Sequence, residues 1–307
     1  MEDKKYTGKQ VDPNEITRQY LDSILLEQRI LDSDLPDIST EIFGETFASP
    51  IMTPAFSHLK ALGEGREAGI VEYARAAKQV NALNWIGMET DEDMEKVLAA
   101  NPKTVRIIKI FADRDLIYSQ MKFAEEHGAI AVGIDIDHPY GNDGKYDVVD
   151  GYEMRPVSQE ELKDFVKAAN VPFVVKGVLS VTDAVKAAVC GADAIVVSHH
   201  HGRLPSAVPP LLVLPQIVEA LAGTDVRIFV DCHIDNGVDA FKALALGADA
   251  VSVGRAMMAP LVNEGVEGVV KKLTRMNEEL TTVMGYTGCL RPEDAEPSML
   301  WIPGQDF

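Results

Sequence analysis

The chain has 307 residues, of which 46% are hydrophobic, so it is long and apolar enough to bury a large core. It carries 29 Lys and Arg against 48 Asp and Glu, a formal net charge of -19 that excludes nucleic acid and anionic lipid as natural partners. The sequence has no signal peptide and no apolar run of membrane-spanning length, so we expect an acidic cytoplasmic protein with no membrane partner.

Residues 1–48 form a polar N-terminal extension with one predicted helix, over residues 13–31. We expect this extension to cover the bottom or the side of the domain that follows. From residue 49 to 307, short β-branched runs alternate with amphipathic stretches, a pattern typical of parallel strands joined by helices. Several runs are continuously apolar, as expected for strands buried on both faces.

Eight strands and eight helices are predicted in this second region. The strands are at residues 49–56, 83–88, 104–111, 130–137, 172–178, 194–199, 227–232 and 250–254. The helices are at residues 66–80, 91–99, 113–126, 159–169, 181–190, 211–222, 237–246 and 262–284. This order predicts a single-domain α/β protein, a (β/α)8 TIM barrel over residues 49–307, preceded by the helical extension.

Local signals support several of these helices. Thr90, Ser158 and Ser180 are predicted N-cap residues, and Glu161 completes a capping box with Ser158. Residues 190–198 are similar to residues 246–254, and in each copy a helix ends on glycine before a strand begins. This weak repeat supports the barrel and carries no information on function.

Two long loops follow strands at the end where the active sites of such barrels lie. Residues 137–156 are rich in Gly, Asp and Tyr, and we interpret them as a lid. Residues 202–210 contain three prolines and follow the sixth strand.

The sixth predicted strand ends in three adjacent histidines and an arginine. Residues 196–203 read Val-Val-Ser-His-His-His-Gly-Arg. An imidazole titrates near neutral pH and can move a proton, and a guanidinium offers two parallel donors to a carboxylate. The segment therefore indicates chemistry beside a carboxyl group. We expect no metal site there, because adjacent strand residues point to opposite faces and chelate poorly.

Two further strand ends carry cationic groups. Lys176 lies within an apolar strand, where an ammonium group needs an anion or an electron-rich ring as a partner. Gly254 and Arg255 follow the last strand and offer backbone N–H groups and a guanidinium, a combination suited to phosphate.

The three cysteines, Cys190, Cys232 and Cys289, lie far apart and form no Cys-x-x-Cys pair. This spacing indicates neither a disulfide framework nor a zinc site, so we expect reduced thiols. Cys232 follows Asp231 at a strand end, where it faces a site or, as we favour, packs as a small hydrophobic residue.

These segments carry a family resemblance from about residue 45 to residue 291. The chain resembles the FMN-dependent α-hydroxy-acid oxidases and dehydrogenases, the group of glycolate oxidase and lactate oxidase. The matching segments are residues 54–56, 112–114, 175–179, 197–203, 241–255 and 288–289.

The resemblance implies FMN as the cofactor and the oxidation of a 2-hydroxy acid to the 2-oxo acid. It places the base on His200, the carboxylate-binding arginine on Arg203, Lys176 against flavin N1, and Asp231 near the ribityl chain; these four are the implied catalytic residues. The implied cofactor-binding residues are Pro54, Ala55, Lys176, Ser198, Asp231, His233, Gly254 and Arg255, and the implied substrate-binding residues are Lys109, His200 and Arg203. The implied partners are a small-molecule carboxylate substrate and further copies of the chain in a homo-oligomer.

The substrate wall departs from the family pattern. Lys109 stands where the family has a tyrosine that contacts substrate, and Ile107 stands where a glutamine contacts the flavin. Residues 139–145 contain no arginine, although the family has a second substrate arginine in this loop. Lys145 replaces it if the lid folds inward. These departures favour a larger or less charged substrate than glycolate or lactate.

The phosphate site also departs from the pattern. Asp235 stands where the family has an arginine that meets the FMN phosphate. A carboxylate beside a phosphate dianion is unfavourable unless it turns away or is protonated. We therefore expect FMN binding to be weaker than usual, with His233, Asn236 and Arg255 compensating.

Two alternative functions stay open. One is a flavin-dependent isomerase resembling type 2 isopentenyl diphosphate isomerase, whose diphosphate substrate requires more cationic groups than these strand ends carry. The other is a non-catalytic relative that binds flavin or a metabolite, as the lost tyrosine and arginines indicate. The retention of Lys176, His200 and Arg203 together favours the oxidoreductase, and His199 and His201 are either structural or part of the site.

Overall fold

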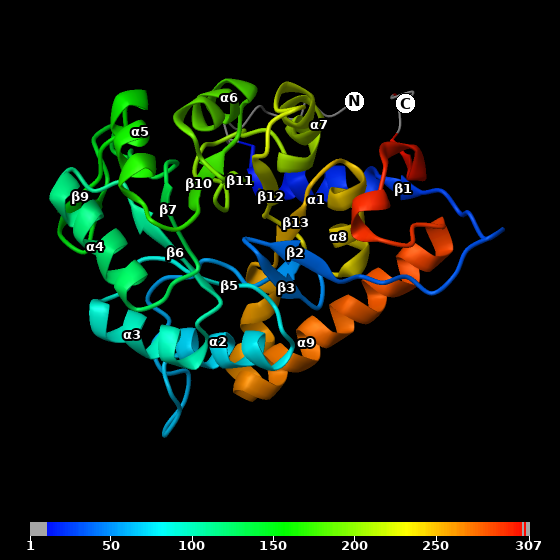
Figure 1. Cartoon of the computed structure of the whole chain (residues 1–307), viewed down its shortest axis with the longest axis horizontal. Coiled ribbons are helices and arrows are strands. Elements are labelled where there is room, and N and C mark those ends of the chain that lie inside the picture. The colour runs from blue at the N-terminus through cyan, green and yellow to red at the C-terminus, as the bar shows by residue number, and fades with distance from the viewer. Residues whose placement is uncertain (1–10, 303, 305–307) are drawn as a thin grey trace, which may run out of the picture.

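The computed structural model describes residues 11–302 and residue 304. Eight parallel strands form one sheet, and helices surround it (Figure 1). In spatial order the strands are β4 (Ile51–Met52), β13 (Ala250–Ser252), β12 (Arg227–Val230), β11 (Ala194–Val197), β10 (Phe173–Val178), β7 (Ala131–Asp135), β6 (Thr104–Lys109) and β5 (Asn84–Ile86). All eight predicted strands are confirmed, each shorter than or equal to its predicted range, and the (β/α)8 barrel is confirmed with them.

A helix follows each strand of the barrel along the chain, as predicted. These helices are α2 (Gly69–Gln79), α3 (Asp91–Ala100), α4 (Arg114–Glu126), α5 (Gln159–Ala168), α6 (Val181–Cys190), α7 (Pro210–Ala220), α8 (Gly237–Ala245) and α9 (Met258–Thr287). Short 3-10 turns are η1 (Arg255–Met257), η2 (Pro292–Asp294) and η3 (Pro297–Met299). None of the described helices combines the length and the apolar character needed to cross a membrane.

The predicted caps are present. The side chains of Thr90 and Ser180 accept hydrogen bonds from backbone N–H groups of the first turn, and Ser158 forms a capping box with Glu161. Gly191 and Gly247 follow α6 and α8 with φ of 91° and 99°, a left-handed conformation that favours glycine.

Backbone and side-chain hydrogen bonds of Thr53 close the barrel where β4 and β5 meet. The backbone N–H of Thr53 donates to the carbonyl of Leu83 at 3.1 Å. The Thr53 hydroxyl donates to Asn84 Oδ1 at 2.8 Å and accepts from the backbone N–H of Trp85 at 2.9 Å. The hydrogen bonds of this one buried threonine therefore take the place of a regular β-ladder between β4 and β5.

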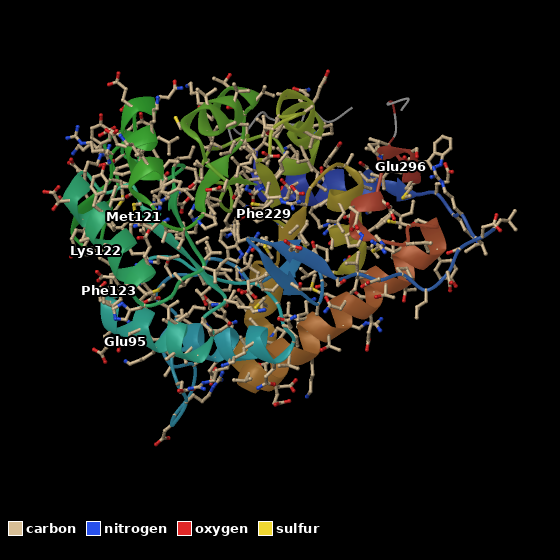
Figure 2. All side chains as sticks on the ribbon, in the orientation of Figure 1. Glu95, Met121, Lys122, Phe123, Phe229 and Glu296 are labelled. Carbon is tan, nitrogen blue, oxygen red and sulfur yellow. The ribbon has the colours of Figure 1, made fainter. Side chains whose placement is uncertain are left out.

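Alternate residues of the strands fill the barrel interior. Met52, Trp85, Ile107 and Phe229 belong to one buried apolar cluster, and Phe229 lies near the middle of the strands in Figure 2. Ile42 and Phe47, from the hairpin of β2 (Thr40–Ile42) and β3 (Glu45–Phe47), join the same cluster. This hairpin covers the bottom of the barrel, as expected for part of the extension.

The helix of the extension differs from the prediction in length and in place. Helix α1 covers Pro13–Ser23, so the predicted helix to residue 31 is wrong at its end. Beyond it, β1 (Leu25–Leu26) pairs antiparallel with β14 (Leu300–Trp301), and this long-range pairing replaces the helical hydrogen bonds. The hydroxyl of Thr17 lies 2.9 Å from His199 Nε2, so α1 packs at the carboxyl ends of the strands and not at the bottom or side.

The lid, residues 137–156, is folded. It contains the hairpin of β8 (Val148–Val149) and β9 (Tyr152–Glu153), and Met154 is fully buried. Isolated bridges join Phe111 to Met154 and Tyr140 to Tyr146. The lid is therefore attached to the barrel above strand β6.

Candidate active site

Strand register places three charged residues side by side at the top of the barrel interior. Lys109 pairs with Asp135 across β6 and β7, and Asp135 pairs with Lys176 across β7 and β10. Parallel neighbours in register point to the same face, so the three side chains meet. Lys109 Nζ lies 2.6 Å from Asp135 Oδ2, and Lys176 Nζ lies 3.6 Å from Asp135 Oδ1. Lys176 also lies 3.8 Å from Asp231 Oδ2.

Asp135 is buried and ionised in this arrangement. Burial alone raises the pKa of a carboxyl group, but the charges of His200, Lys109 and Lys176 together hold the pKa of Asp135 well below its usual value. The nearby Asp137 differs, because burial and the charge of Asp135 raise its pKa. One firmly ionised carboxylate and one more basic carboxylate therefore lie side by side.

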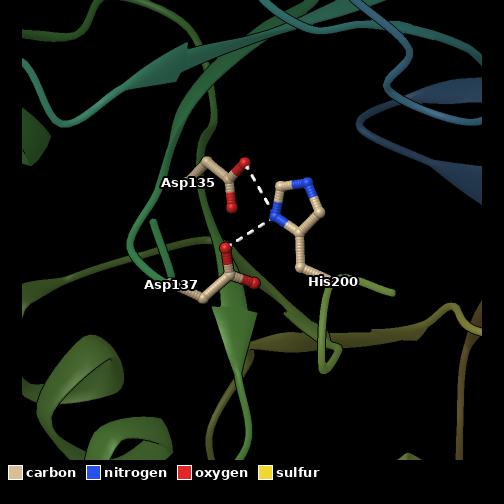
Figure 3. Close-up of side chains that lie close together, drawn as sticks. All are labelled: Asp135, Asp137 and His200. Atoms are coloured by element: carbon tan, nitrogen blue, oxygen red, sulfur yellow. Dashed lines mark hydrogen bonds and ion pairs between the residues drawn. The ribbon is translucent and has the colours of Figure 1, made fainter. Parts of the chain in front are cut away.

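The imidazole of His200 faces both carboxylates through one ring nitrogen (Figure 3). Its Nδ1 is 2.6 Å from Asp137 Oδ1 and 3.3 Å from Asp135 Oδ2. Its Nε2 points away from both carboxylates. Burial lowers the pKa of His200, but Asp135 and then Asp137, acting against Lys176, raise it to about 9. In the neutral form of His200, Nε2 can take a proton while Nδ1 donates to a carboxylate.

Unusual backbone conformations hold His200 in place. His200, His201 and Gly202 have φ of 44°, 61° and 84°, a strained left-handed run for the two histidines. Gly177 has φ of 89°, and a Cβ there would lie 2.5 Å from the Asp137 carboxyl group. Glycine is therefore required beside Lys176 so that Asp137 can approach His200.

A cavity of about 260 Å³ opens at the carboxyl ends of the strands. Its lining residues are Asn14, Pro54, Ala55, Phe56, Lys176, His200, His201, Asp231, Cys232, His233, Ser252, Gly254 and Arg255. The structure thus brings together most of the residues predicted from the sequence. Ser198 does not line the cavity; it is buried, and its hydroxyl accepts a hydrogen bond from the His200 backbone N–H at 3.0 Å.

Arg203 and Lys109 also lie outside the lining of this cavity. Arg203 Nη2 donates to Asp147 Oδ2 of the lid at 2.9 Å, and His138 Nε2 lies 2.6 Å from the same oxygen. The predicted carboxylate-binding arginine is therefore already paired with a carboxylate of the chain itself. Lys145 does not replace the missing arginine, because its side chain is 81% exposed.

The far end of the cavity holds cationic and imidazole groups. Asn14 Oδ1 accepts from Arg255 Nη2 at 2.9 Å and lies 2.8 Å from His201 Nδ1. Asp235 does not line the cavity, but its Oδ2 lies 3.8 Å from His233 Nδ1 and 3.7 Å from Arg18 Nη1, so its carboxylate stays beside this end and is paired with these two groups. His233 first, and then Arg18, lower the pKa of Asp235.

Two residues whose roles the sequence left open are now placed. His199 is buried, contacts Thr17 and accepts from the backbone N–H of Gly202 at 3.0 Å, so its role is structural. Cys232 lines the cavity, so our preference for a core position is wrong. Its thiol donates to Asp231 Oδ1 at 2.9 Å.

The side chains of Asp135, Asp137 and His200 lie close enough together to hold a metal ion. Two ammonium groups already neutralise Asp135, however, and they oppose the approach of a divalent cation. The cluster therefore fits proton transfer better than metal binding.

Sequence reasoning assigned no role to Asp135, Asp137, Asp147 or Asn14, and it left the role of His201 open. The first two were visible as carboxylates two positions apart at a strand end, a spacing that puts both near one mouth. Asp147 and Asn14 carry no such signal, because they belong to the lid and to the extension.

The chain is similar to known proteins over most of its length. The profile of the FMN-dependent dehydrogenase family matches residues 11–159 and 147–302. A 2-hydroxyacid oxidase of Dictyostelium discoideum is 26% identical, over 90% of this chain and 79% of its own. Glycolate oxidase 3 of Arabidopsis thaliana is 30% identical, over 89% of this chain and 83% of its own. A solved mandelate oxidase variant with a monooxide FMN adduct is 29% identical, with a TM-score of 0.83 over 94% of this chain and 91% of its own.

Proposed function

Because the chain belongs to the FMN-dependent dehydrogenase family, we propose that this oxidoreductase converts a 2-hydroxy acid to the 2-oxo acid. The relatives named 2-hydroxyacid oxidase, glycolate oxidase and mandelate oxidase support this substrate class. The observation that carries the proposal is the placement of His200, whose Nδ1 is held by Asp137 while Nε2 stays free.

The residues of the cavity fit FMN. Lys176 places a buried positive charge at one end, beside His200. At the other end, nitrogen atoms of Arg255, His201 and His233 lie within 3.3 Å of a single oxygen atom, Oδ1 of Asn14. A cation beside a redox ring and a set of donors around an anionic oxygen are the two features that FMN requires. Bound FMN would accept the two electrons and the second of the two protons that the substrate loses.

His200 acts as the base in this proposal. The substrate loses two electrons and two protons, and Nε2 takes one of these protons. The carboxylates of Asp137 and Asp135 stabilise the imidazolium that results and fix the ring orientation through Nδ1. Gly177 supports the same geometry, because it lets Asp137 approach the ring.

Arg203 binds the substrate carboxylate in this proposal, and the substrate replaces Asp147 on its guanidinium. A bidentate arginine–carboxylate pair fixes orientation as well as charge. Lys109 acts indirectly, because its ammonium group is held by Asp135 and keeps that carboxylate ionised next to His200. In this proposal Lys109 is thus a positioning residue and does not contact the substrate, in contrast to the direct substrate binding that the sequence implied.

Three further assignments belong to the same proposal. Residues 1–48 are an extension of a single catalytic domain at residues 49–307, the protein acts in the cytoplasm, and it assembles as a homo-oligomer. The high net charge of -19 supports an aqueous compartment. The side chains of Leu31 and Leu35 are 93% and 82% exposed, and they support a contact between copies. Sedimentation of the purified protein tests the oligomer.

A substrate screen tests the proposed activity. We expect the wild-type protein to turn over at least one 2-hydroxy acid, and H200A to lose roughly 100-fold or more of kcat, the usual contribution of a positioned base. H127A, at an exposed histidine after α4, is the matched control and should keep full activity. A wild-type protein that binds FMN but oxidises none of the acids, or an H200A variant with unchanged turnover, would overturn the proposal.

A further inference from the structure

Three nitrogen atoms converge on the side-chain oxygen of Asn14 in helix α1. His201 Nδ1 lies 2.8 Å, Arg255 Nη2 lies 2.9 Å and His233 Nε2 lies 3.3 Å from Asn14 Oδ1. These groups come from three separate strand ends and from the extension, and all of them line the cavity. One neutral carbonyl oxygen thus occupies the centre of a cluster of imidazole and guanidinium groups, which we call the phosphate cluster.

The phosphate cluster has the donors of an anion site. An oxygen that meets two imidazoles and a guanidinium is bound far more strongly when it carries negative charge. The position of Asn14 is built and not accidental. Its amide nitrogen donates to the carbonyl of His201 at 3.2 Å and to Asp12 Oδ1 at 2.9 Å. Gly202 makes room, because a Cβ there would lie 3.0 Å from the Asn14 amide nitrogen.

We propose that Asn14 Oδ1 occupies the place of a phosphate oxygen of FMN, and that FMN binds by displacing Asn14 from His201, His233 and Arg255, with both imidazoles protonated in the complex. The proposal rests on FMN as the cofactor of the proposed function and does not depend on which acid is oxidised. It makes cofactor binding depend on pH, because two of the three phosphate-binding side chains are histidines.

The charges around the phosphate cluster support proton uptake on binding. Without an anion, burial lowers the pKa of His201, and the charge of Arg255 lowers it further. Arg255 Nη2 also donates toward His233 Nε2 at 3.0 Å, so this nitrogen serves as an acceptor until an anion takes the guanidinium. A phosphate dianion reverses both effects. The other charged or titratable groups that face the two histidines are Asp12, which precedes α1, Arg18 of α1, His199, His200 and Asp235.

The sign of the pH dependence follows from this uptake. A histidine whose pKa is raised by the bound phosphate adds affinity below that raised pKa, and the affinity is lost as pH rises through it. The phosphate itself loses its second proton near about pH 6, which favours binding at higher pH and opposes the trend. A fall in FMN affinity above neutral pH therefore reports the loss of a proton from the histidines of the phosphate cluster.

Binding of FMN and of riboflavin to the full-length apoprotein, followed by quenching of flavin fluorescence, tests the proposal. Riboflavin has the same ring and no phosphate, so the ratio of the two affinities isolates the phosphate cluster. We expect the FMN-to-riboflavin ratio to fall at least about tenfold from pH 6.5 to 8.5, since each linked proton changes affinity up to about tenfold per pH unit. In H201Q and H233Q the dependence should flatten while riboflavin affinity stays unchanged.

The Asn14→Ala variant tests whether the FMN phosphate takes the place of Asn14 Oδ1 or only receives hydrogen bonds beside it. Removing the competing oxygen should raise FMN affinity severalfold and leave riboflavin affinity unchanged, whereas Gln19→Ala, on the exposed face of the same helix, should change neither. An FMN-to-riboflavin affinity ratio that stays constant with pH would mean that Arg255 alone binds the phosphate, and it would overturn the role of the two histidines. Unchanged or weaker FMN binding in Asn14→Ala would overturn the displacement. An apoprotein that binds neither flavin would refute the FMN site itself and, with it, both proposals.

Discussion

The protonation of His200 determines the pH at which the proposed reaction runs. A base must be neutral before it takes a proton, and the carboxylates beside Nδ1 raise the pKa of His200 to about 9. At pH 7, two units below that value, only about one molecule in 100 carries the neutral imidazole. We therefore expect kcat/KM of the FMN-saturated enzyme to rise about tenfold per pH unit through neutrality and to level off above about pH 9.

Asp135→Asn should move this midpoint downward. The substitution removes a carboxylate 3.3 Å from His200 Nδ1, leaves the ammonium group of Lys109 without its partner, and leaves that of Lys176 with Asp231 alone. These changes disfavour the imidazolium. A charge-assisted hydrogen bond contributes about 1.5–3 kcal/mol, and one pKa unit corresponds to about 1.4 kcal/mol. The midpoint should therefore fall by about one to two pH units.

Steady-state kinetics across pH, with FMN in excess, measures this midpoint. The exposed Asp143→Asn in the lid is the control for loss of one carboxylate, and Asp137→Asn, which removes the partner at 2.6 Å, is the second variant if Asp135→Asn does not fold. Both active-site variants should shift the profile in the same direction. A midpoint that stays in place or rises in both would refute the assignment of His200 as a base held by these carboxylates.

Two other substitutions probe the surroundings of the site. Asp147→Asn should lower KM for the acid with little change in kcat, because the substrate no longer competes with a lid carboxylate for Arg203; a higher KM would show that Asp147 instead helps to bind substrate. Lys109→Met should lower the free energy of unfolding by about 3 kcal/mol, the lower end for breaking a buried pair, since Asp135 keeps Lys176 as a partner; unchanged urea denaturation would contradict the buried pair.

The barrel could be predicted from the sequence because each strand is a short, continuous apolar run between helices with recognisable caps. The end of α1 could not. Residues 24–31 are apolar enough to extend a helix, but Leu25 pairs with Trp301, at the opposite end of the chain. A contact between such distant segments leaves no local pattern, so tertiary structure overrides helix propensity there.

The same distinction explains which site residues were predicted. Lys176, His200 and Arg255 lie at strand ends, and the barrel topology alone brings strand ends together. Asp147 and Asn14 reach the site from the lid and from the extension, whose positions depend on packing that no periodicity describes. The contacts of Asp147 with Arg203 and of Asn14 with Arg255 were therefore visible only in the structure.

The most direct test of the central claim is the visible absorption spectrum of the purified protein, recorded before and after anaerobic addition of a panel of 2-hydroxy acids. The structure predicts flavin bands that bleach with at least one acid in the wild-type protein and stay unbleached on the same timescale in H200A. Flavin bands that no acid bleaches, or that bleach equally fast without His200, would contradict the oxidation of a 2-hydroxy acid by this site.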